Sequence, residues 1–280
     1  MSEVRHLLAA AAAQLGGGSD ARTEAELLLA HVLGQSRAWL YAWPEFKPDA
    51  EPARAFERLV EARRLGEPIA YLTGRRAFWS LDLDVTPAVL IPRPETELLV
   101  ELALARTSQD AACSVADLGT GSGAIALALA RERPLARVLA TDASTAALEI
   151  ARANAQRLRI ANVAFAQGDW CEALGDARFD LIVSNPPYIE TGDLHLGEGD
   201  LRHEPPSALA SGSDGLDAIR RICAQARAHL NPRGWLLLEH GWNQAARVRA
   251  LLDAESFFDT ADSTRDAAGH ERVTVAQAAS

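Results

Sequence analysis

Apolar residues in the first quarter of the chain recur three or four positions apart, which is the spacing of an amphipathic helix. Stretches of this kind cover residues 7–15, 25–33 and 52–65, and each is followed by a glycine that can end a helix. No apolar run long enough for a convincing strand interrupts them. The pattern therefore predicts a small all-helical domain over residues 1–73.

The spacing changes after this domain. From Phe78 to Leu90 apolar and polar residues alternate, which predicts a β-hairpin, and we interpret residues 74–92 as a hairpin linker. Pro94 then suits the first turn of a helix that runs to about Arg106. A helix start of this kind needs no function. A proline-rich segment just before a ligand-binding fold could equally lie against the ligand.

Strand and helix patterns alternate from Ser114 onward, which is typical of a doubly wound α/β fold. Two further strands in the tail are expected to close the sheet in the antiparallel direction. Residues 93–280 are thus predicted to form a Rossmann-like domain with a seven-stranded mixed sheet. The expected strands are Ser114–Leu118, Arg137–Thr141, Val163–Ala166, Phe179–Ser184, Trp235–Leu238 and two near Phe257–Phe258 and Arg272–Ala276; the expected helices are Ala124–Arg131, Thr145–Leu158, Leu216–Leu230 and Gln244–Leu252.

The charge of the chain argues against a nucleic-acid partner. The formal net charge is −10, and no basic run is longer than two residues. Proteins that bind duplex nucleic acid usually carry a basic face. The balance weakens direct nucleic-acid binding without excluding it, because a local basic patch can sit on an acidic protein.

Cysteine and histidine usage points to a cytoplasmic protein without a metal. Cys113, Cys171 and Cys223 are far apart, which is typical of reduced thiols in a cytosolic protein. The seven histidines show no ligand spacing, so no metal is expected. The alanine run 9–13 is too short for a signal or a membrane span. We expect no membrane partner, and a monomer by default.

The first strand of the α/β domain runs into a glycine-rich turn and then a helix. Gly119, Gly121 and Gly123 follow the spacing Gly-x-Gly-x-Gly, whereas a dinucleotide site expects Gly-x-Gly-x-x-Gly. Glycines let a ligand approach the backbone, and the free N–H groups of a helix N-terminus can bind it. Alone, such a turn is weak evidence for a ligand site.

Polar residues at the ends of neighbouring strands make the ligand more specific. Asp142 ends the second strand, where a carboxylate can accept both hydroxyls of a ribose. Asp169 and Trp170 end the third strand and offer a carboxylate and an indole to an adenine ring. Asp117, beside the glycine turn, would oppose a phosphate and favour an ammonium group. S-adenosylmethionine has an ammonium, a sulfonium and no phosphate, and it is the predicted cofactor.

The fourth strand pattern is followed by Asn185, Pro186, Pro187 and Tyr188. The two prolines end the strand and prevent immediate helix entry, so they predict a stiff turn at the carboxyl end of a strand. The Asn185 side-chain oxygen and the Pro186 carbonyl could each accept one N–H of an –NH2 group, with Tyr188 stacked on its plane. Taken alone, these residues could equally form a plain strand-ending turn.

Short motifs are spread over nearly the whole chain: GEPIAYLTG (66–74), LIPRPETE (90–97), DLGTGSG (117–123), Asp142, GDW (168–170), VSNPPY (183–188) and GHERV (269–273). By these motifs the chain resembles the protein-(glutamine-N5) methyltransferases that modify peptide chain release factors. The helical domain and the motifs before the proline turn separate this family from DNA methyltransferases, which share only the Asn-Pro-Pro-Tyr tetrapeptide.

The resemblance implies an enzyme that transfers a methyl group from S-adenosylmethionine to the N5 nitrogen of the glutamine in the Gly-Gly-Gln motif of class I release factors. It also implies that the helical domain helps to bind the substrate protein. Asn185, Pro186 and Tyr188 are the expected catalytic residues, and these three with Pro187 would hold the glutamine. Together with the strand-end residues, the expected cofactor-binding set is Asp117, Gly119, Thr120, Gly121, Ser122, Gly123, Asp142, Asp169, Trp170 and Asn185.

Two other functions stay open at this point. A nucleic-acid adenine N6 methyltransferase would share the tetrapeptide, but the acidic balance and the lack of a basic recognition segment argue against it. A non-catalytic docking protein built on the same fold is opposed by the complete set of cofactor and turn residues.

Overall fold

The computed structural model describes residues 2–280, apart from the side chain of residue 260. The chain divides into two compact units, one ending at Arg75 and the other running from Arg76 to Ser280. The division lies close to residue 73, where the helical domain was expected to end. The hairpin expected as a linker therefore lies almost wholly in the second unit.

The regular elements of the first unit are helices. They are α1 (Val4–Gln14), α2 (Gly18–Leu33), α3 (Arg37–Ala42), α4 (Ala50–Arg64) and α5 (Ile69–Thr73). Apolar side chains from the longer helices, such as Leu8, Leu28 and Phe56, form the core of this unit. Gly34 ends α2 with a φ of 61°, a left-handed conformation that glycine adopts at little cost.

A seven-stranded mixed sheet forms the centre of the second unit, which confirms the predicted fold class. The strand order is β5-β4-β3-β6-β7-β9-β8. The first five strands in this order run parallel, and β9 pairs antiparallel with β7 and β8. The strands are β3 (Ser114–Leu118), β4 (Arg137–Asp142), β5 (Val163–Gln167), β6 (Phe179–Ser184), β7 (Leu230–Glu239), β8 (Phe258–Arg265) and β9 (Glu271–Ala278).

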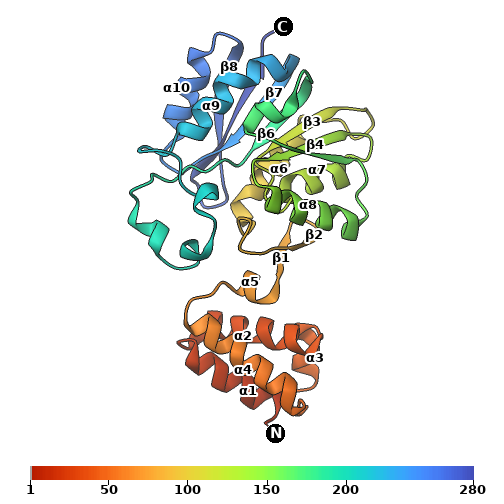
Figure 1. Ribbon diagram of the computed structural model, residues 1–280, viewed down its shortest axis with the longest axis vertical. Helices are drawn as coiled ribbons and strands as arrows, with labels where there is room; N and C mark the ends of the chain where they lie inside the picture. Colours follow the sequence, from red (N-terminus) through yellow and green to blue (C-terminus); the bar gives the residue numbers. More distant parts are fainter. Residues whose placement is uncertain (1) are drawn as a thin grey trace. The chain divides into compact units, whose positions relative to one another are not determined.

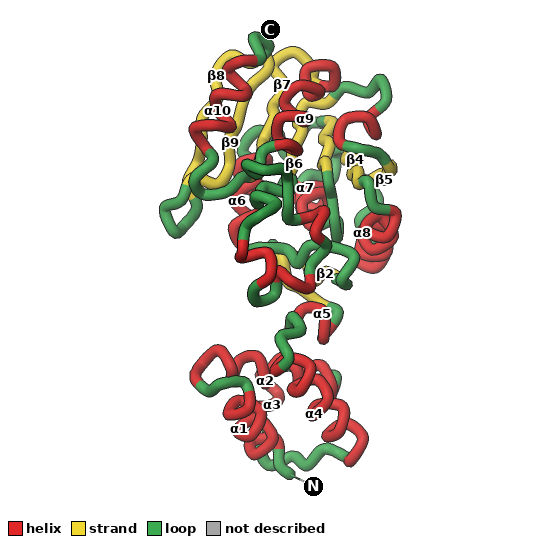
Figure 2. The backbone as a smooth tube through the Cα atoms, turned by 60° about the vertical axis from the view of Figure 1, so that its left-hand side comes forward, coloured by secondary structure: helices red, strands yellow, loops and turns green. Residues whose placement is uncertain are grey.

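Helices cover both faces of this sheet (Figure 1; Figure 2). One face carries α6 (Glu97–Leu104), α7 (Ala124–Glu132) and α8 (Thr145–Leu158), and the other carries α9 (Asp217–Ala226) and α10 (Ala245–Ala254). On β6, Leu181 and Val183 pack in the hydrophobic core on the side of α6 and α7, while Ile182 packs in the core on the side of α9 and α10. Because both faces are buried, such a strand has a continuous apolar run instead of an alternating pattern.

The hairpin of β1 (Arg75–Phe78) and β2 (Leu81–Asp84) is fixed to helix α8. Asn154 Nδ2 donates to the carbonyl oxygens of Asp84 and Ser122, each at 2.9 Å, and its Oδ1 accepts from the Asp84 N–H at 2.7 Å. Arg157 adds a contact to the Asp84 carboxylate at 2.8 Å. One buried asparagine therefore joins the hairpin, the glycine turn and α8.

Short 3-10 helices position the segments around the sheet edge. Pro94 begins η1 (Pro94–Thr96), as its place in the sequence predicted, and η2 (Trp170–Leu174) follows β5. The connection from β6 to α9 contains η3 (Leu194–Gly197), η4 (Leu201–His203) and η5 (Pro206–Ala208). Within residues 2–280, no helix has both the length and the apolar character needed to cross a membrane.

Candidate active site

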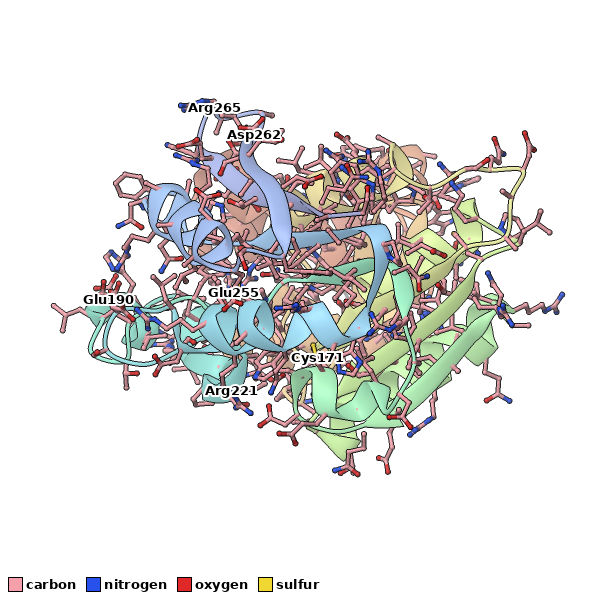
Figure 3. All side chains as sticks on the ribbon, turned by 90° about the horizontal axis from the view of Figure 1, so that it is seen from above. Cys171, Glu190, Arg221, Glu255, Asp262 and Arg265 are labelled. Carbon is pink, nitrogen blue, oxygen red and sulfur yellow. The ribbon has the colours of Figure 1, made fainter. Side chains whose placement is uncertain are left out.

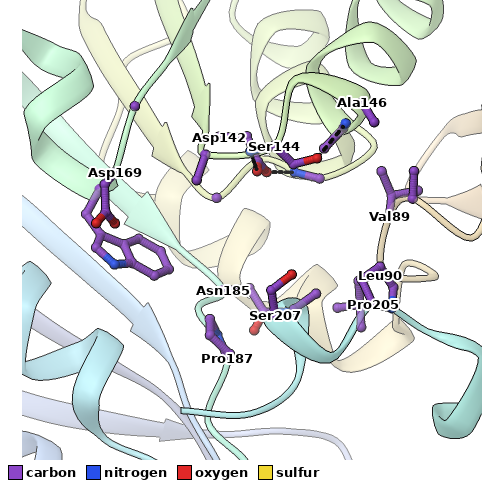
Figure 4. A pocket seen from close by; sticks show the side chains of 18 residues that line it. Val89, Leu90, Asp142, Ser144, Ala146, Asp169, Asn185, Pro187, Pro205 and Ser207 are labelled. Carbon is purple, nitrogen blue, oxygen red and sulfur yellow. Dashed lines mark hydrogen bonds between the residues drawn. The ribbon is translucent and has the colours of Figure 1, made fainter. Parts of the chain in front are cut away.

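A pocket of about 400 Å³ opens at the carboxyl ends of β3 to β6 (Figure 4). In the sheet β3 lies between β4 and β6. The strands β4 and β5 follow it on one side and β6 and β7 on the other, so the strand order reverses at β3. Open α/β sheets bind ligands at such a switch point. The lining has no lysine or arginine and consists of Ala88, Val89, Leu90, Gly119, Gly121, Asp142, Ala143, Ser144, Ala146, Ala147, Gly168, Asp169, Trp170, Asn185, Pro187, Pro205, Ser207 and Ala208.

Asp117, near the end of β3, holds the glycine turn from inside. Its Oδ2 accepts from the Thr120 hydroxyl at 2.6 Å and from the N–H of Ala126, in the first turn of α7, at 3.1 Å. Its Oδ1 has no hydrogen-bond partner among the described residues. Burial raises the pKa of Asp117 to about 7; the two hydrogen bonds oppose this rise and the charge of Asp142 adds to it.

Gly119 and Trp170 are in close contact. A Cβ on Gly119 would lie 3.3 Å from Trp170 Cζ3, and Gly119 has a φ of 72°. Trp170 has a φ of 50°, a left-handed conformation that is uncommon for a residue other than glycine. The indole consequently forms a wall of the pocket directly beside the glycine turn.

The two strand-end carboxylates differ in how they are held. Asp142 Oδ2 accepts from the Gly121 N–H at 2.9 Å. Its Oδ1 accepts from the Ser144 N–H, also at 2.9 Å (Figure 4). A carboxylate has about four acceptor sites, so both oxygens keep capacity for hydroxyl groups of a ligand. Asp169 instead pairs with Arg221 of α9 at 2.5 Å, and Arg221 points into solvent (Figure 3).

Asn185 follows the last residue of β6, and a hydrogen bond to the short helix η1 holds its side chain. Its Nδ2 donates to Thr96 Oγ1 of η1 at 3.0 Å. No described residue donates a hydrogen bond to its Oδ1. The amide oxygen is therefore an acceptor that is available to a ligand.

A second, smaller pocket adjoins the first at Asn185. Its volume is about 60 Å³, and Asn185 and Pro187 line both pockets. Tyr188 lines only the smaller one, and burial together with the charge of Glu239 raises the pKa of its hydroxyl. The full lining is Leu90, Arg93, Asn185, Pro186, Pro187, Tyr188, Ile189, Leu201, Ala208 and Leu209.

Beyond Tyr188, the connection between β6 and α9 also contributes to both pockets, and these later residues were not predicted as site residues from the sequence. Pro205 and Ser207 line the larger pocket, and the only sequence signal was the length of this irregular stretch. Glu204 is buried and pairs with Arg93 at 2.6 Å, which fastens the connection to the segment before η1. Burial raises the pKa of Glu204, and Arg93 opposes the rise.

The predicted site residues divide into three groups by position. Gly119, Gly121, Asp142, Asp169, Trp170, Asn185 and Pro187 line the larger pocket, whereas Pro186 and Tyr188 line only the smaller one. Asp117, Thr120, Ser122 and Gly123 line neither of these two pockets. Thr120 and Ser122 are buried, and Gly123 is the N-cap of α7 with a φ of 86°. These four residues shape the turn from behind.

The cysteines show no feature of a reactive or metal-binding site. All three are free, and Cys171 and Cys223 are buried (Cys171 is labelled in Figure 3). Burial raises the pKa of Cys171 and of Cys223 to about 12, so neither thiol ionises near neutral pH. In the described part of the chain, no cluster of three or more histidine, cysteine or acidic residues could hold a metal.

Known proteins match this chain over nearly its whole length. Residues 6–74 match the family described as PrmC N-terminal domain, and residues 94–198 match the methyltransferase small domain. The release factor glutamine methyltransferase of Xylella fastidiosa (strain Temecula1) is 56% identical over 254 residues, which cover 91% of this chain and 92% of that protein. The protein of the same name from Escherichia coli (strain K12) is 46% identical over 273 residues, 98% of each chain.

Solved structures of more distant proteins share the fold. A 16S rRNA N2 G1207 methyltransferase of Thermus thermophilus, solved in complex with AdoMet and guanosine, gives a TM-score of 0.55 at 24% identity. The similarity covers 73% of this chain and 49% of that one. A methyltransferase from Pyrococcus furiosus also gives 0.55, at 20% identity, over 79% of this chain and 98% of that one. At this identity the likeness concerns the fold alone, which is that of a methyltransferase.

Proposed function

Because the chain belongs to the family of release factor glutamine methyltransferases, we propose that it transfers the methyl group of S-adenosylmethionine to N5 of the glutamine in the Gly-Gly-Gln motif of class I peptide chain release factors. The observation that carries this proposal is the available Oδ1 of Asn185 where a large and a small pocket meet. We further propose that the enzyme is a cytoplasmic monomer that acts on the protein substrate without binding nucleic acid directly.

The larger pocket suits S-adenosylmethionine. Its lining contains two carboxylates and no cationic side chain, which fits an adenosine ligand without phosphates. In this proposal Asp142 accepts the ribose hydroxyls, and Asp169 and Trp170 face the adenine. The backbone of residues 119–123 lies against the remainder of the ligand, with Asp117 favouring its ammonium group from beneath the turn. Bound S-adenosylmethionine supplies an electrophilic methyl group on a sulfonium.

The smaller pocket suits the glutamine side chain. Its volume of about 60 Å³ admits a narrow chain, and the rings of Pro186, Pro187 and Tyr188 offer flat apolar surfaces to a carboxamide. Asn185 Oδ1 and the Pro186 carbonyl each accept one N–H of the amide, and Tyr188 stacks on its plane. The helical domain would help to hold the release factor.

Holding both N–H groups addresses the main obstacle to this reaction. An amide nitrogen is a poor nucleophile because its lone pair is delocalised into the carbonyl group. The two acceptors orient the nitrogen, and they also stabilise the positive charge that develops on it during transfer. Orientation can contribute roughly 7–11 kcal/mol in favourable cases, and one well-placed polar contact about 2.7–4 kcal/mol. The N-methylated, N-protonated amide is acidic enough to release its proton to water, so we assign no general base.

Transfer of a labelled methyl group to purified substrates tests the proposal. We expect label in a class I release factor, none in a release factor whose motif glutamine is replaced by alanine, and none in DNA or RNA. Asn185→Ala should lower turnover by roughly 10²–10³-fold, with cofactor affinity nearly unchanged in calorimetry. Label in nucleic acid but not in the release factor would contradict the proposed substrate, and wild-type turnover of Asn185→Ala would remove Asn185 from the mechanism.

A further inference from the structure

A row of buried polar side chains leads from Asn185 into the interior of the second unit. It consists of Thr96 in η1 and Glu239 at the end of β7, with Tyr188 beside Glu239. Thr96 is 4% exposed and Glu239 is 1% exposed, and neither lines the two pockets. Burying a carboxylate costs free energy unless hydrogen bonds or an opposite charge compensate it. The partners of Glu239 therefore bear on its role.

Glu239 is poorly compensated where it lies. Its Oε1 accepts from the Tyr188 hydroxyl at the long distance of 3.5 Å, and its Oε2 has no hydrogen-bond partner in the described part of the chain. The charged groups that face it are Arg272 of β9, which already pairs with another carboxylate, and Glu95 of η1. Burial raises the pKa of Glu239 to about 7; the Thr96 hydroxyl and Arg272 oppose the rise, and Glu95 adds to it.

Thr96 connects this carboxyl group to Asn185. A threonine hydroxyl has one proton to donate and can accept two hydrogen bonds. Its Oγ1 already accepts from Asn185 Nδ2 at 3.0 Å, so its own proton needs another acceptor. The Thr96 hydroxyl is the strongest of the groups that favour the ionised form of Glu239, and Glu239 Oε2 has no hydrogen-bond partner in the described part of the chain, so this carboxylate is the acceptor available to the Thr96 hydroxyl.

We propose that Thr96 and Glu239 are positioning residues: ionised Glu239 accepts a hydrogen bond from the Thr96 hydroxyl, which leaves Thr96 Oγ1 to accept from Asn185 Nδ2. The amide of Asn185 is then fixed with Oδ1 toward the substrate. This inference rests on the proposed function of Asn185 as an acceptor for the substrate amide. The two ends of the Asn185 amide have similar size, so without a directional partner the group could turn and present a donor to the substrate –NH2.

The protonation state of Glu239 determines the direction of the hydrogen bonds along the row. When Glu239 is protonated it can donate to Thr96, and Thr96 can then donate to the oxygen of Asn185. The amide nitrogen would in that case face the substrate –NH2, where two donors oppose each other. Since the pKa of Glu239 is about 7, the productive orientation should be gained as the pH rises through neutrality and lost below it.

Nuclear magnetic resonance of the full-length protein tests the row without reference to turnover. In ¹⁵N-labelled wild-type protein, the side-chain NH2 signals of Asn185 should shift with pH, with a midpoint of about 7. In Glu239→Gln this titration should disappear. An Asn185 signal that does not change between about pH 6 and about pH 8 in the wild type would overturn the inference, whatever the activity of the enzyme.

Turnover of three variants supplies the second test. Thr96→Val should lower kcat by roughly ten- to a hundredfold with little change in cofactor affinity, while Thr96→Ser, which keeps the hydroxyl, should retain most of the turnover. The control is Thr107→Val, which removes a buried hydroxyl that donates only to the Ala103 carbonyl; its kcat should match the wild type. Each variant is first shown to be folded by its thermal transition.

The outcomes separate the inference from the proposed function. If the wild type methylates a release factor and folded Thr96→Val is equally active, the positioning role is wrong and the proposed function stands. If the wild type methylates no release factor, the proposed function fails. The pH dependence of the Asn185 side-chain signals then still decides whether the row of hydrogen bonds exists.

Discussion

At the scale of single residues, the glycine turn has two positions that differ in one contact. Gly119 and Gly121 both have positive φ values, of 72° and 54°, but a Cβ would meet Trp170 only at Gly119. Gly119→Ala should therefore lower the free energy of unfolding by about 2 kcal/mol or more, and Gly121→Ala by about 1 kcal/mol, because an alanine is strained at a positive φ at both positions. Urea denaturation of the two variants measures the difference. Equal losses would show that the Trp170 contact has no energetic weight.

The sequence predicts the position of a residue where its immediate neighbours determine the backbone. It does not predict a contact between residues that are far apart in the chain. Asn185 was found because Pro186 and Pro187 mark a strand-ending turn locally. Thr96 lies 89 positions from Asn185, and no local pattern announces their hydrogen bond. Glu239 lies just beyond the strand predicted at residues 235–238 and was not singled out, because only the packing of the sheet brings it beside Tyr188.

At the scale of elements, Asn154 is expected to contribute strongly to the joining of the hairpin to the α/β unit. It is fully buried and makes three hydrogen bonds to backbone groups of Asp84 and Ser122. Asn154→Ala leaves these groups without their partner, so we expect the free energy of unfolding to fall by about 3 kcal/mol. Arg157→Ala, which removes a partly exposed contact to the same Asp84, should cost under about 1 kcal/mol. A similar small loss for Asn154→Ala in denaturant unfolding would contradict this role.

Element bounds were predicted well where local signals are strong. The predicted bounds of β3, β6 and α8 agree with the structure, since each has a glycine, proline or capping residue at one end. Helix α9 ends at Ala226, where a 3-10 turn replaces the last predicted residues. Strand β7 begins at Leu230 instead of Trp235, because Leu230 pairs with Phe179 before an irregularity in the register. Such pairing depends on a distant strand and has no signature in the segment itself.

At the scale of the whole molecule, stability should depend on pH through Asp117. Its pKa is raised from 3.8 to about 7 in the folded protein, so the folded state keeps a proton that the unfolded state releases. The proton on Asp117 contributes fully to stability below about pH 4. As the pH rises to about 7 this contribution is lost, which lowers the free energy of unfolding by on the order of 3–4 kcal/mol. Asp117→Asn cannot titrate, so its free energy of unfolding should fall less than that of the wild type across this range. Parallel curves for the two proteins in denaturant unfolding at several pH values would contradict the assignment.

The fold class and the edge of the sheet that carries the larger pocket followed from the order of strand and helix patterns, whereas the pocket walls from residues 88–90 and 205–208 did not. Residues 205–208 lie in a segment without periodicity, and residues 88–90 lie at the end of a pattern that predicted only a hairpin. Their positions depend on contacts such as the buried pair of Arg93 and Glu204. The family of the chain was recognisable because its motifs are short continuous runs of sequence, such as residues 117–123 and 183–188 at the ends of strands.

The most direct measurement of the central claim is a crystal structure of the enzyme with the demethylated cofactor product and a class I release factor. We predict that the glutamine side-chain nitrogen lies about 3 Å from both Asn185 Oδ1 and the Pro186 carbonyl oxygen and faces the sulfur of the product. A glutamine nitrogen bound elsewhere, or an Asn185 amide with its nitrogen toward the substrate, would contradict the claim.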